Sequence, residues 1–403
     1  MDSRIEGLKN YNGESYTGDA PGRFNEHKTK VLLIDDQASV ARAVSLMLSG
    51  ESDIEFHFCQ NPAKAVKKVI EINPTVILQD LVMPKIDGLM LMKFYRSNEK
   101  TRDIPVIILS SKEEPIVKAK AFELGANDYV VKLPDRIELI ARIRHHSRGY
   151  ITLLERNEAT ERLNAELAAA GDYVKKLLPK PILGEVLSTD WRFVPSTSLG
   201  GDFFGYHWLD EDHFIIYLLD VCGHGIGAAL LSVSAINVIR SQTLPNTDFR
   251  RPDHVFAGLN EAFQMGNHNG MYFTIWYGVY NKSSRALVYA SAGHPPALLV
   301  DSGGTKTLGT PNMFIGAFQG VSYQSDSIEI DTQSRLYVFS DGAYEIRMWP
   351  DNTMWTFESF VDLMANPPCD RISPLNRLWD FVARALGPKR LSDDFSILEV
   401  TFK

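Results

Sequence analysis

Short apolar runs alternate with helical spacing in the first third of the chain. The runs predict five strands, at residues 31–34, 54–59, 76–79, 106–109 and 129–131. The segments between them place apolar residues three or four positions apart, most clearly at 40–48 and 137–145. Such alternation predicts an α/β domain in which helices cover both faces of a parallel sheet.

The pattern changes between residues 149 and 178, where Gly149 and Gly171 are the only glycines and proline is absent. This stretch predicts a linker helix that ends at Pro179 and Pro181, because proline removes a backbone donor. Its apolar positions Leu163, Leu167, Val174 and Leu177 form a weak heptad seam, which predicts a homodimer through the linker. The alternative is a linker that packs on its own domain.

From residue 181 onward the chain is rich in β-type runs, with four helical segments among them. The expected strands are 191–194, 213–220, 272–280, 285–291, 297–301, 335–340 and 395–402, and the expected helices are 227–241, 253–265, 356–364 and 374–386. Grouped strands with a few long helices predict an α+β sandwich. The chain is thus divided into a flexible tail (1–28), an α/β domain (29–148), a helical linker (149–180) and an α+β domain (181–403).

Composition narrows the function classes. The chain has 403 residues and a formal net charge of -8, which argues against a nucleic-acid partner. Its three cysteines are far apart in sequence, so they indicate neither a disulfide framework nor a zinc site. No apolar run reaches the roughly 18 residues of a membrane span. These features predict a cytoplasmic protein that makes no contact with a membrane.

Five polar residues fall at the carboxyl ends of the predicted parallel strands, where such sheets bind ligands. They are Asp35, Asp36, Asp80, Ser110 and Lys132. Neighbouring carboxylates can hold Mg²⁺, and one carboxylate can attack a phosphoryl group whose oxygens Ser110 and Lys132 contact. A single Asp at a strand end is usually a turn residue, but five such positions at one edge predict a phosphoryl-accepting site.

These positions lie in motifs that resemble the receiver domain of two-component response regulators, a flavodoxin-like fold. The motifs are Leu33-Ile-Asp-Asp36, Leu78-Gln-Asp-Leu-Val-Met-Pro84, Val106-Ile-Ile-Leu-Ser-Ser111 and Asn127-Asp-Tyr-Val-Val-Lys132. The resemblance implies that Asp80 is phosphorylated by a sensor histidine kinase or a phosphotransfer protein. It also implies that Asp35, Asp36, Asp80 and the Val82 carbonyl hold Mg²⁺. Ser110, Tyr129 and Lys132 would form the receiver switch.

A second set of carboxylates lies in the predicted α+β domain. Its members are Asp202, Asp220, Asp341, Asp393 and Asp394, most of them beside glycine or serine. Four or five carboxylates can hold two divalent cations, and a cation pair can clamp a phosphoryl group and activate water. Each Asp-Gly pair alone is more often a turn, whereas the joint pattern predicts a metal-dependent phosphatase.

This domain resembles the PPM (protein phosphatase 2C-like) family in its bacterial sporulation and stress-regulator branch. The matching stretches are Gly200-Gly-Asp-Phe-Phe204, Asp220-Val-Cys-Gly-His-Gly-Ile226, Tyr289-Ala-Ser-Ala-Gly-His-Pro-Pro296, Tyr337-Val-Phe-Ser-Asp-Gly342 and Ser392-Asp-Asp-Phe-Ser396. The resemblance implies two Mn²⁺ or Mg²⁺ ions bridged by Asp220, with the Val221 carbonyl assisting.

In the same resemblance, Asp341 and Asp393 complete the catalytic set, Asp202 lies close by, and Asp394 is a weaker candidate ligand than Asp393. Three departures from the family are visible. Gly205 stands where many relatives have Asp, and Cys222 replaces a common Ser. No Arg lies shortly before Gly201, where eukaryotic relatives bind phosphate. The bacterial branch often lacks that Arg too.

The resulting hypothesis is a response regulator whose output is a phosphoserine/phosphothreonine protein phosphatase, with an anti-sigma-factor antagonist of the STAS type as substrate. The alternative is a catalytically inactive adaptor that binds a sigma factor or its regulator. A diguanylate cyclase is disfavoured, because Phe203 follows Gly-Gly-Asp202 where a cyclase needs Glu.

Overall fold

The computed structural model describes residues 28–84, 86–111, 114–365 and 372–403. The expected N-terminal tail lies outside the described residues, apart from Lys28. The chain divides into two compact units, Met1–Arg162 and Leu163–Lys403. Each unit is treated separately below.

The first unit is built on a five-stranded parallel sheet with strand order β2-β1-β3-β6-β7. Its strands are β1 (Thr29–Ile34), β2 (Ile54–Cys59), β3 (Val76–Asp80), β6 (Val106–Ser110) and β7 (Asp128–Val131). Two short strands, β4 (Val82–Met83) and β5 (Ile86–Asp87), pair after β3. The α/β fold and all five strands expected from the sequence are confirmed.

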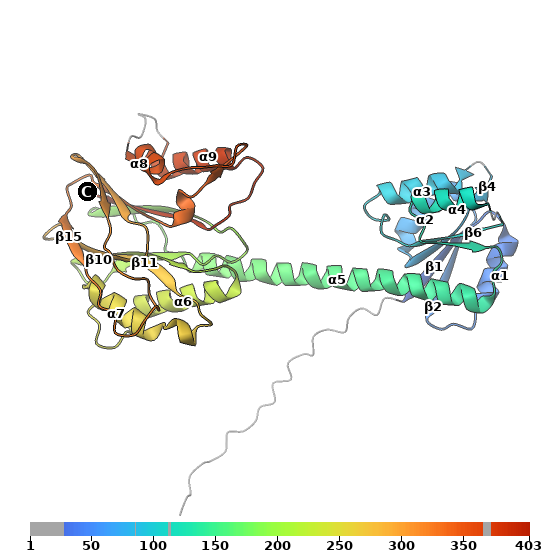
Figure 1. Ribbon diagram of the computed structural model, residues 1–403, viewed down its shortest axis with the longest axis horizontal. Helices are drawn as coiled ribbons and strands as arrows, with labels where there is room; N and C mark the ends of the chain where they lie inside the picture. Colours follow the sequence, from blue (N-terminus) through green and yellow to red (C-terminus); the bar gives the residue numbers. More distant parts are fainter. Residues whose placement is uncertain (1–27, 85, 112–113, 366–371) are drawn as a thin grey trace, which may run out of the picture. The chain divides into compact units, whose positions relative to one another are not determined.

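Helices cover both faces of this sheet (Figure 1). The helical elements before the linker are α1 (Ala38–Leu48), η1 (Pro62–Lys64), α2 (Ala65–Ile72), α3 (Gly88–Ser97) and α4 (Pro115–Glu123). One face packs on α1 and the start of α5, and the other packs on α2, α3 and α4. Because β1, β3 and β6 are covered on both sides, their residues form continuous apolar runs rather than an alternating pattern.

The last helix of the first unit and the expected linker are one helix, α5 (Arg136–Lys176). The sequence analysis separated them at residue 149, but Gly149 does not interrupt the helix. At its far end, Val174 and Leu177 pack against the core of the second unit. For these two residues the structure agrees with the alternative, a linker that packs on its own domain. Leu163, in contrast, is 54% exposed.

The second unit is a sandwich of two five-stranded antiparallel sheets. One sheet has the order β15-β12-β11-β10-β9 and the other β14-β13-β16-β19-β8. The strands are β8 (Leu187–Val194), β9 (Phe203–Trp208), β10 (His213–Val221), β11 (Phe273–Asn281), β12 (Ala286–Ala292), β13 (Ala297–Asp301), β14 (Gly304–Leu308), β15 (Asp326–Glu329), β16 (Arg335–Phe339) and β19 (Phe395–Phe402), with the small pair β17 (Arg347–Met348) and β18 (Thr353–Met354). The expected α+β sandwich is confirmed, although β9, β14, β15 and the short pair β17 and β18 were not predicted.

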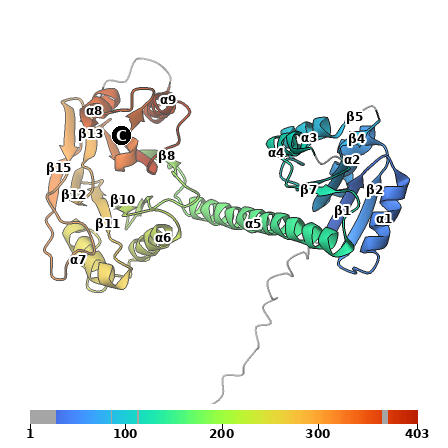
Figure 2. The ribbon, with the colours of Figure 1, turned by 45° about the vertical axis from the view of Figure 1, so that its right-hand side comes forward.

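Two helical layers flank the sandwich (Figures 1 and 2). The elements are α6 (Ile226–Arg240), α7 (Pro252–Ala262), η2 (Met265–Asn267), η3 (Asp341–Ala343), α8 (Phe357–Ala365) and α9 (Pro374–Leu386). Helices α6 and α7 pack on the sheet that contains β10, and α8 and α9 pack on the sheet that contains β16 and β19.

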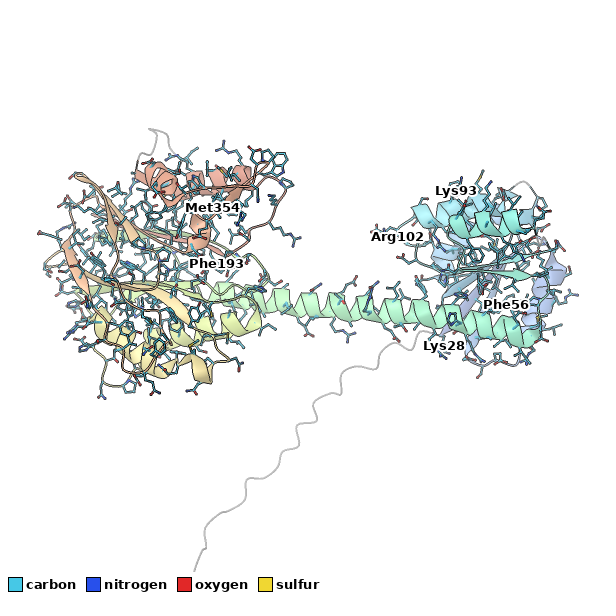
Figure 3. All side chains as sticks on the ribbon, viewed as in Figure 1. Lys28, Phe56, Lys93, Arg102, Phe193 and Met354 are labelled. Carbon is cyan, nitrogen blue, oxygen red and sulfur yellow. The ribbon has the colours of Figure 1, made fainter. Side chains whose placement is uncertain are left out.

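Aromatic side chains fill much of the space between the sheets. Phe193 of β8, labelled in Figure 3, lies against Phe204 of β9 with their ring centroids 6.3 Å apart. Trp276 and Phe402 are fully buried in the same core. In the described parts of the chain, no helix is both long and apolar enough to cross a membrane.

Candidate functional sites

The first site lies at the carboxyl ends of the parallel strands. Asp35 follows β1, Asp80 ends β3, Ser110 ends β6, and Lys132 follows β7. The Lys132 ammonium lies 2.8 Å from Asp35 Oδ2 and 2.8 Å from Asp80 Oδ2. The parallel topology thus brings together residues that are up to 97 positions apart, from Asp35 to Lys132.

The carboxylates of this site suit a hard cation. One ligand oxygen each from Asp35, Asp36 and Asp80 lie within 4.8 Å of one another. Asp36 Oδ1 is buried without a hydrogen-bond partner in the structure. Burial raises the pKa of Asp80 despite the Lys132 ammonium beside it, so ionised Asp80 needs further positive charge. The donor set of three carboxylates fits Mg²⁺, which needs few protein ligands and keeps its waters.

The other expected receiver residues differ in how deeply they are buried. Ser110 is fully buried at the end of β6. Val82 is exposed, and its N–H donates to Asp80 Oδ1 over 3.3 Å, so the loop after β3 turns back on the carboxylate. Tyr129 is half-buried on β7, where the Lys118 ammonium lies 5.4 Å from its ring centroid. The pKa of Lys132 is raised, since its two carboxylate partners outweigh the effect of burial.

The second site is a pocket where the two sheets of the sandwich meet. Asp220 comes from the end of β10 in one sheet, and Asp341 and Asp393 lie beside β16 and β19 of the other. All three, with Val221, line one cavity of about 440 Å³. The three expected catalytic aspartates are therefore neighbours, although 173 positions separate Asp220 from Asp393.

The electrostatics of this pocket are those of carboxylates that lack a counter-charge. Burial raises the pKa of Asp220 to about 8, and Asp341 and Asp393 add to the effect. Burial and Asp393 raise the pKa of Asp341 to about 6. The pKa of Asp202 is also raised, by complete burial and by Asp220 and Asp394. Each shift shows that the ionised form is disfavoured without a cation.

Asp394 does not line the pocket and has a different environment from Asp393. Its Oδ1 accepts hydrogen bonds from Ser196 N at 2.7 Å and Ser196 Oγ at 2.9 Å, and its Oδ2 accepts from Gly201 N at 2.6 Å. A Cβ at Gly200 would lie 2.3 Å from Asp394 Oδ2, so only glycine fits there. Both oxygens of the Asp394 carboxylate thus accept hydrogen bonds from the loop before β9, and we propose that Asp394 positions this loop and that Asp393 is the better candidate metal ligand.

Asp202 lies at the end of that loop and is buried beneath the pocket. Its N–H is 3.4 Å from Asp394 Oδ2, while its own Oδ2 has no hydrogen-bond partner in the structure. A buried carboxylate oxygen without a donor suits a cation or its bound water. Among the described residues, however, the second set does not bring three ligand oxygens within 4.8 Å of one another. The set fits divalent cations that keep water in part of their coordination shell.

One residue of this pocket, Thr274, was not singled out from the sequence. Thr274 lines the pocket from β11, and its Oγ1 has no hydrogen-bond partner in the structure. His224 lines the same pocket, whereas His294 is buried, and burial lowers its pKa to about 4. At Gly205, a Cβ would lie 2.4 Å from the Tyr217 hydroxyl, which explains why an Asp does not fit there.

Two family profiles match the chain. The family described as "Response regulator receiver domain" matches residues 31–144, and the family described as "Stage II sporulation protein E (SpoIIE)" matches residues 210–403. The chain thus contains a region similar to receiver domains followed by a region similar to SpoIIE. The SpoIIE match includes Asp220, Asp341 and Asp393, and the receiver match includes Asp35, Asp36, Asp80 and Lys132.

Individual relatives agree with the two matches. Phosphoserine phosphatase RsbP of Bacillus subtilis is 30% identical over 207 residues, 51% of this chain and 50% of RsbP. Response regulator ArlR of Staphylococcus saprophyticus is 35% identical over 117 residues, 29% of this chain and 51% of ArlR. This receiver–SpoIIE chain therefore spans about half the length of these curated relatives.

A solved structure supports the fold of the SpoIIE-type domain. The SiaA-PP2C domain of Pseudomonas aeruginosa superposes with a TM-score of 0.52 at 19% sequence identity, covering 61% of this chain and 99% of that domain. At this identity the similarity shows the fold alone.

The different environments of Asp393 and Asp394 give a testable contrast. Asp394→Ala is expected to lower the free energy of unfolding by about 3 kcal/mol, because buried N–H donors are left without an acceptor. Asp393→Ala removes an exposed side chain, so the expected loss of stability is below about 1 kcal/mol. Denaturant unfolding in EDTA measures both without a contribution from metal. Equal losses in the two variants would contradict the role given to Asp394.

Proposed function

We propose that this chain is a response regulator whose receiver, phosphorylated on Asp80, controls a metal-dependent phosphoserine/phosphothreonine protein phosphatase. The carrying observation is that Asp220, Asp341 and Asp393 line one pocket in the SpoIIE-matching region. The relative RsbP is a phosphoserine phosphatase, which supports the substrate class. A sensor histidine kinase or phosphotransfer protein is the proposed donor for Asp80.

The chemistry proposed for the pocket rests on its own residues. Bound Mn²⁺ or Mg²⁺ would supply charge neutralisation and an activated water. Asp220, Asp341 and Asp393 would hold the cations, with the Val221 carbonyl and the buried Asp202 carboxylate contributing from the pocket wall and floor. Asp394 fixes the loop that positions Asp202. Thr274 Oγ1 can donate a hydrogen bond to a substrate oxygen in the pocket.

The receiver chemistry is proposed on the same basis. The Asp80 carboxylate would attack the phosphorus of a phosphodonor, and the donor's leaving group would depart with the electrons of the broken bond. Asp35 and Asp36 would hold Mg²⁺ with Asp80 and the Val82 carbonyl. Lys132, 2.8 Å from Asp80, is placed to pair with a phosphoryl oxygen. Ser110 and Tyr129 are proposed as the switch residues.

The proposed substrate is a phosphorylated STAS-type partner protein. The test is incubation of the whole chain with such a partner, in Mn²⁺ and a small phosphodonor, with release of inorganic phosphate as the readout. A phosphotyrosine peptide serves as the control substrate, and turnover of that peptide alone would contradict the substrate class. Binding of the partner without turnover would favour the inactive adaptor instead. We prefer the enzyme, because each expected pocket position retains its carboxylate.

We also propose a homodimer through α5, over fewer residues than the sequence predicted. Val174 and Leu177 are packed in the chain's own core, which leaves Leu163 and Leu167 as the accessible apolar pair. Leu163→Glu combined with Leu167→Glu is expected to halve the mass measured by light scattering, since it places charges in the seam. Wild-type chain that is monomeric with and without phosphodonor would contradict the proposal.

A further inference from the structure

A groove adjoins the pocket of Asp220, Asp341 and Asp393. It has a volume of about 570 Å³, and its wall includes Ser196, Thr197, Trp379, Leu386, Lys389 and Arg390. Ser196 and Thr197 line the carboxylate pocket as well, so the two hollows share one rim. A polypeptide whose phosphorylated residue enters the pocket can therefore continue across this rim into the groove.

The charges of the two hollows are opposite. Among the described residues that line the groove, the only charged ones are Lys389 and Arg390. The described lining of the carboxylate pocket, in contrast, contains no Lys or Arg. The groove thus offers positive charge beside a pocket whose own protein charges are negative.

The two cations differ in how firmly they are held. Lys389 Nζ donates to Asn352 Oδ1 over 3.0 Å. Arg390 is exposed, and its guanidinium forms no ion pair within the described parts of the chain. A guanidinium has five donors in a planar fork that matches a carboxylate, so Arg390 is the better placed of the two to bind an acidic ligand.

The groove lining also has an apolar part. Trp379 of α9 packs against Phe395 with ring centroids 5.2 Å apart, and the Arg192 guanidinium lies 5.3 Å from the Trp379 ring. Arg192 is itself held by a 2.8 Å hydrogen bond to Asn376. An indole and two cations in one groove suit an acidic polypeptide, whose main chain and aliphatic carbons can lie on the indole.

We propose that this groove binds the polypeptide flanking the phosphorylated residue of the substrate, and that Arg390, assisted by Lys389, selects acidic flanking residues. This inference rests on the proposed phosphatase function and adds a substrate preference to it. Arg390 acts in specificity and takes no part in the chemical step. Arg390 is absent from the described lining of the carboxylate pocket, so hydrolysis of a small phosphate ester there is expected to be independent of Arg390.

Three phosphoserine peptides that differ only in acidic, neutral or basic flanking residues test the proposal. In Arg390→Glu, KM for the acidic peptide is expected to rise about tenfold, because an exposed attraction becomes a repulsion. KM for the basic peptide is expected to fall, and kcat/KM for p-nitrophenyl phosphate to stay unchanged. Arg390→Lys should retain most of the acidic preference.

Arg384→Glu is the matched control. Arg384 is also exposed on α9, but it lines neither hollow, and its Nε donates to the Asp380 carbonyl over 2.9 Å. An equal rise in KM for Arg384→Glu would mean that the change in net charge, and not the groove, causes the effect. That result would overturn the proposal. An Arg390→Glu variant with wild-type KM for the acidic peptide would also overturn it.

A binding measurement separates this inference from the phosphatase proposal. Fluorescence anisotropy of the labelled, unphosphorylated acidic peptide on the Mn²⁺-loaded chain needs no turnover. Binding that is lost in Arg390→Glu, together with no hydrolysis of any ester, would support the groove and contradict the phosphatase. Hydrolysis of all three peptides with equal KM would support the phosphatase and contradict the groove.

Discussion

Asp220→Asn is expected to lower the Mn²⁺-dependent turnover of p-nitrophenyl phosphate by roughly a thousandfold. Asp220 lies at the end of β10, and burial, assisted by the carboxylates of Asp341 and Asp393, raises its pKa to about 8. An amide at this position removes the negative charge that would hold two cations together. Turnover measured against Mn²⁺ concentration checks the prediction, and a wild-type rate with the same metal dependence would contradict it.

A matched control lies in the turn before the same strand. Glu211 is exposed and does not line the pocket, so Glu211→Gln makes the same change of charge without touching the site. Its turnover is expected to equal that of the wild type. A comparable loss in both variants would mean that net charge, and not the pocket, determines the rate.

Asp220→Asn is expected to stabilise the metal-free chain at alkaline pH. The pKa of Asp220 is raised from 3.8 to about 8 in the fold, so its contribution to stability is fully present below pH 3.8 and is lost as pH rises through 8. Asn does not titrate and avoids this loss. In EDTA, Asp220→Asn should therefore unfold at a temperature several degrees above wild type at pH 8, with the gap closing toward pH 4.

Added Mn²⁺ should reverse that order, because cations favour the ionised carboxylates of the wild type. Thermal scans with and without Mn²⁺ at pH 8 measure the reversal. This pattern would show that the pocket carboxylates lower the stability of the metal-free chain and that bound cations compensate for this loss. A metal-free wild type that is more stable at pH 8 than Asp220→Asn would contradict the electrostatic account of the pocket.

Features that depend on local sequence and simple topology could be predicted. The Asp35, Asp80 and Lys132 cluster follows from parallel strands, since their carboxyl ends share one edge. The strands β13 and β19 and helix α9 have the bounds expected from apolar spacing. The missed strands lack that spacing: β14 is mostly exposed, and β9 has four buried residues in succession, from Phe203 to Tyr206.

Features that depend on distant contacts could not be predicted. Ser196 and Asp394 are 198 positions apart, and nothing beside either residue indicates that a backbone loop occupies the Asp394 carboxylate. Arg390 and Trp379 line one groove with Ser196, which is distant from both in sequence, so this grouping also depends on non-local contacts. The boundary expected at residue 149 was wrong for a local reason. A Cβ at Gly149 would meet nothing within 4 Å, so no close contact requires glycine there, and α5 continues through this residue.

Asp80→Asn is expected to abolish labelling of the chain by a small phosphodonor in Mg²⁺, because an amide cannot attack phosphorus as a carboxylate does. Lys132→Ala should reduce labelling strongly, as it removes the ammonium 2.8 Å from Asp80 that would pair with the incoming phosphoryl group. Since burial raises the pKa of Asp80, wild-type labelling should decline as the pH is lowered. Phos-tag electrophoresis or mass spectrometry measures the labelled fraction.

Asp103→Asn provides the matched control, because Asp103 is an exposed aspartate that precedes β6, at the amino end of the strands, away from the cluster. It is expected to be labelled normally. In the whole chain, phosphodonor should change the phosphatase rate of the wild type and of Asp103→Asn, and leave that of Asp80→Asn constant. A shift of a few kcal/mol in a two-state linker is enough to change the rate many-fold. Undiminished labelling of Asp80→Asn would show that another residue accepts the phosphoryl group. A phosphatase rate that responds equally to phosphodonor in all three chains would show that phosphorylation of Asp80 does not control the phosphatase.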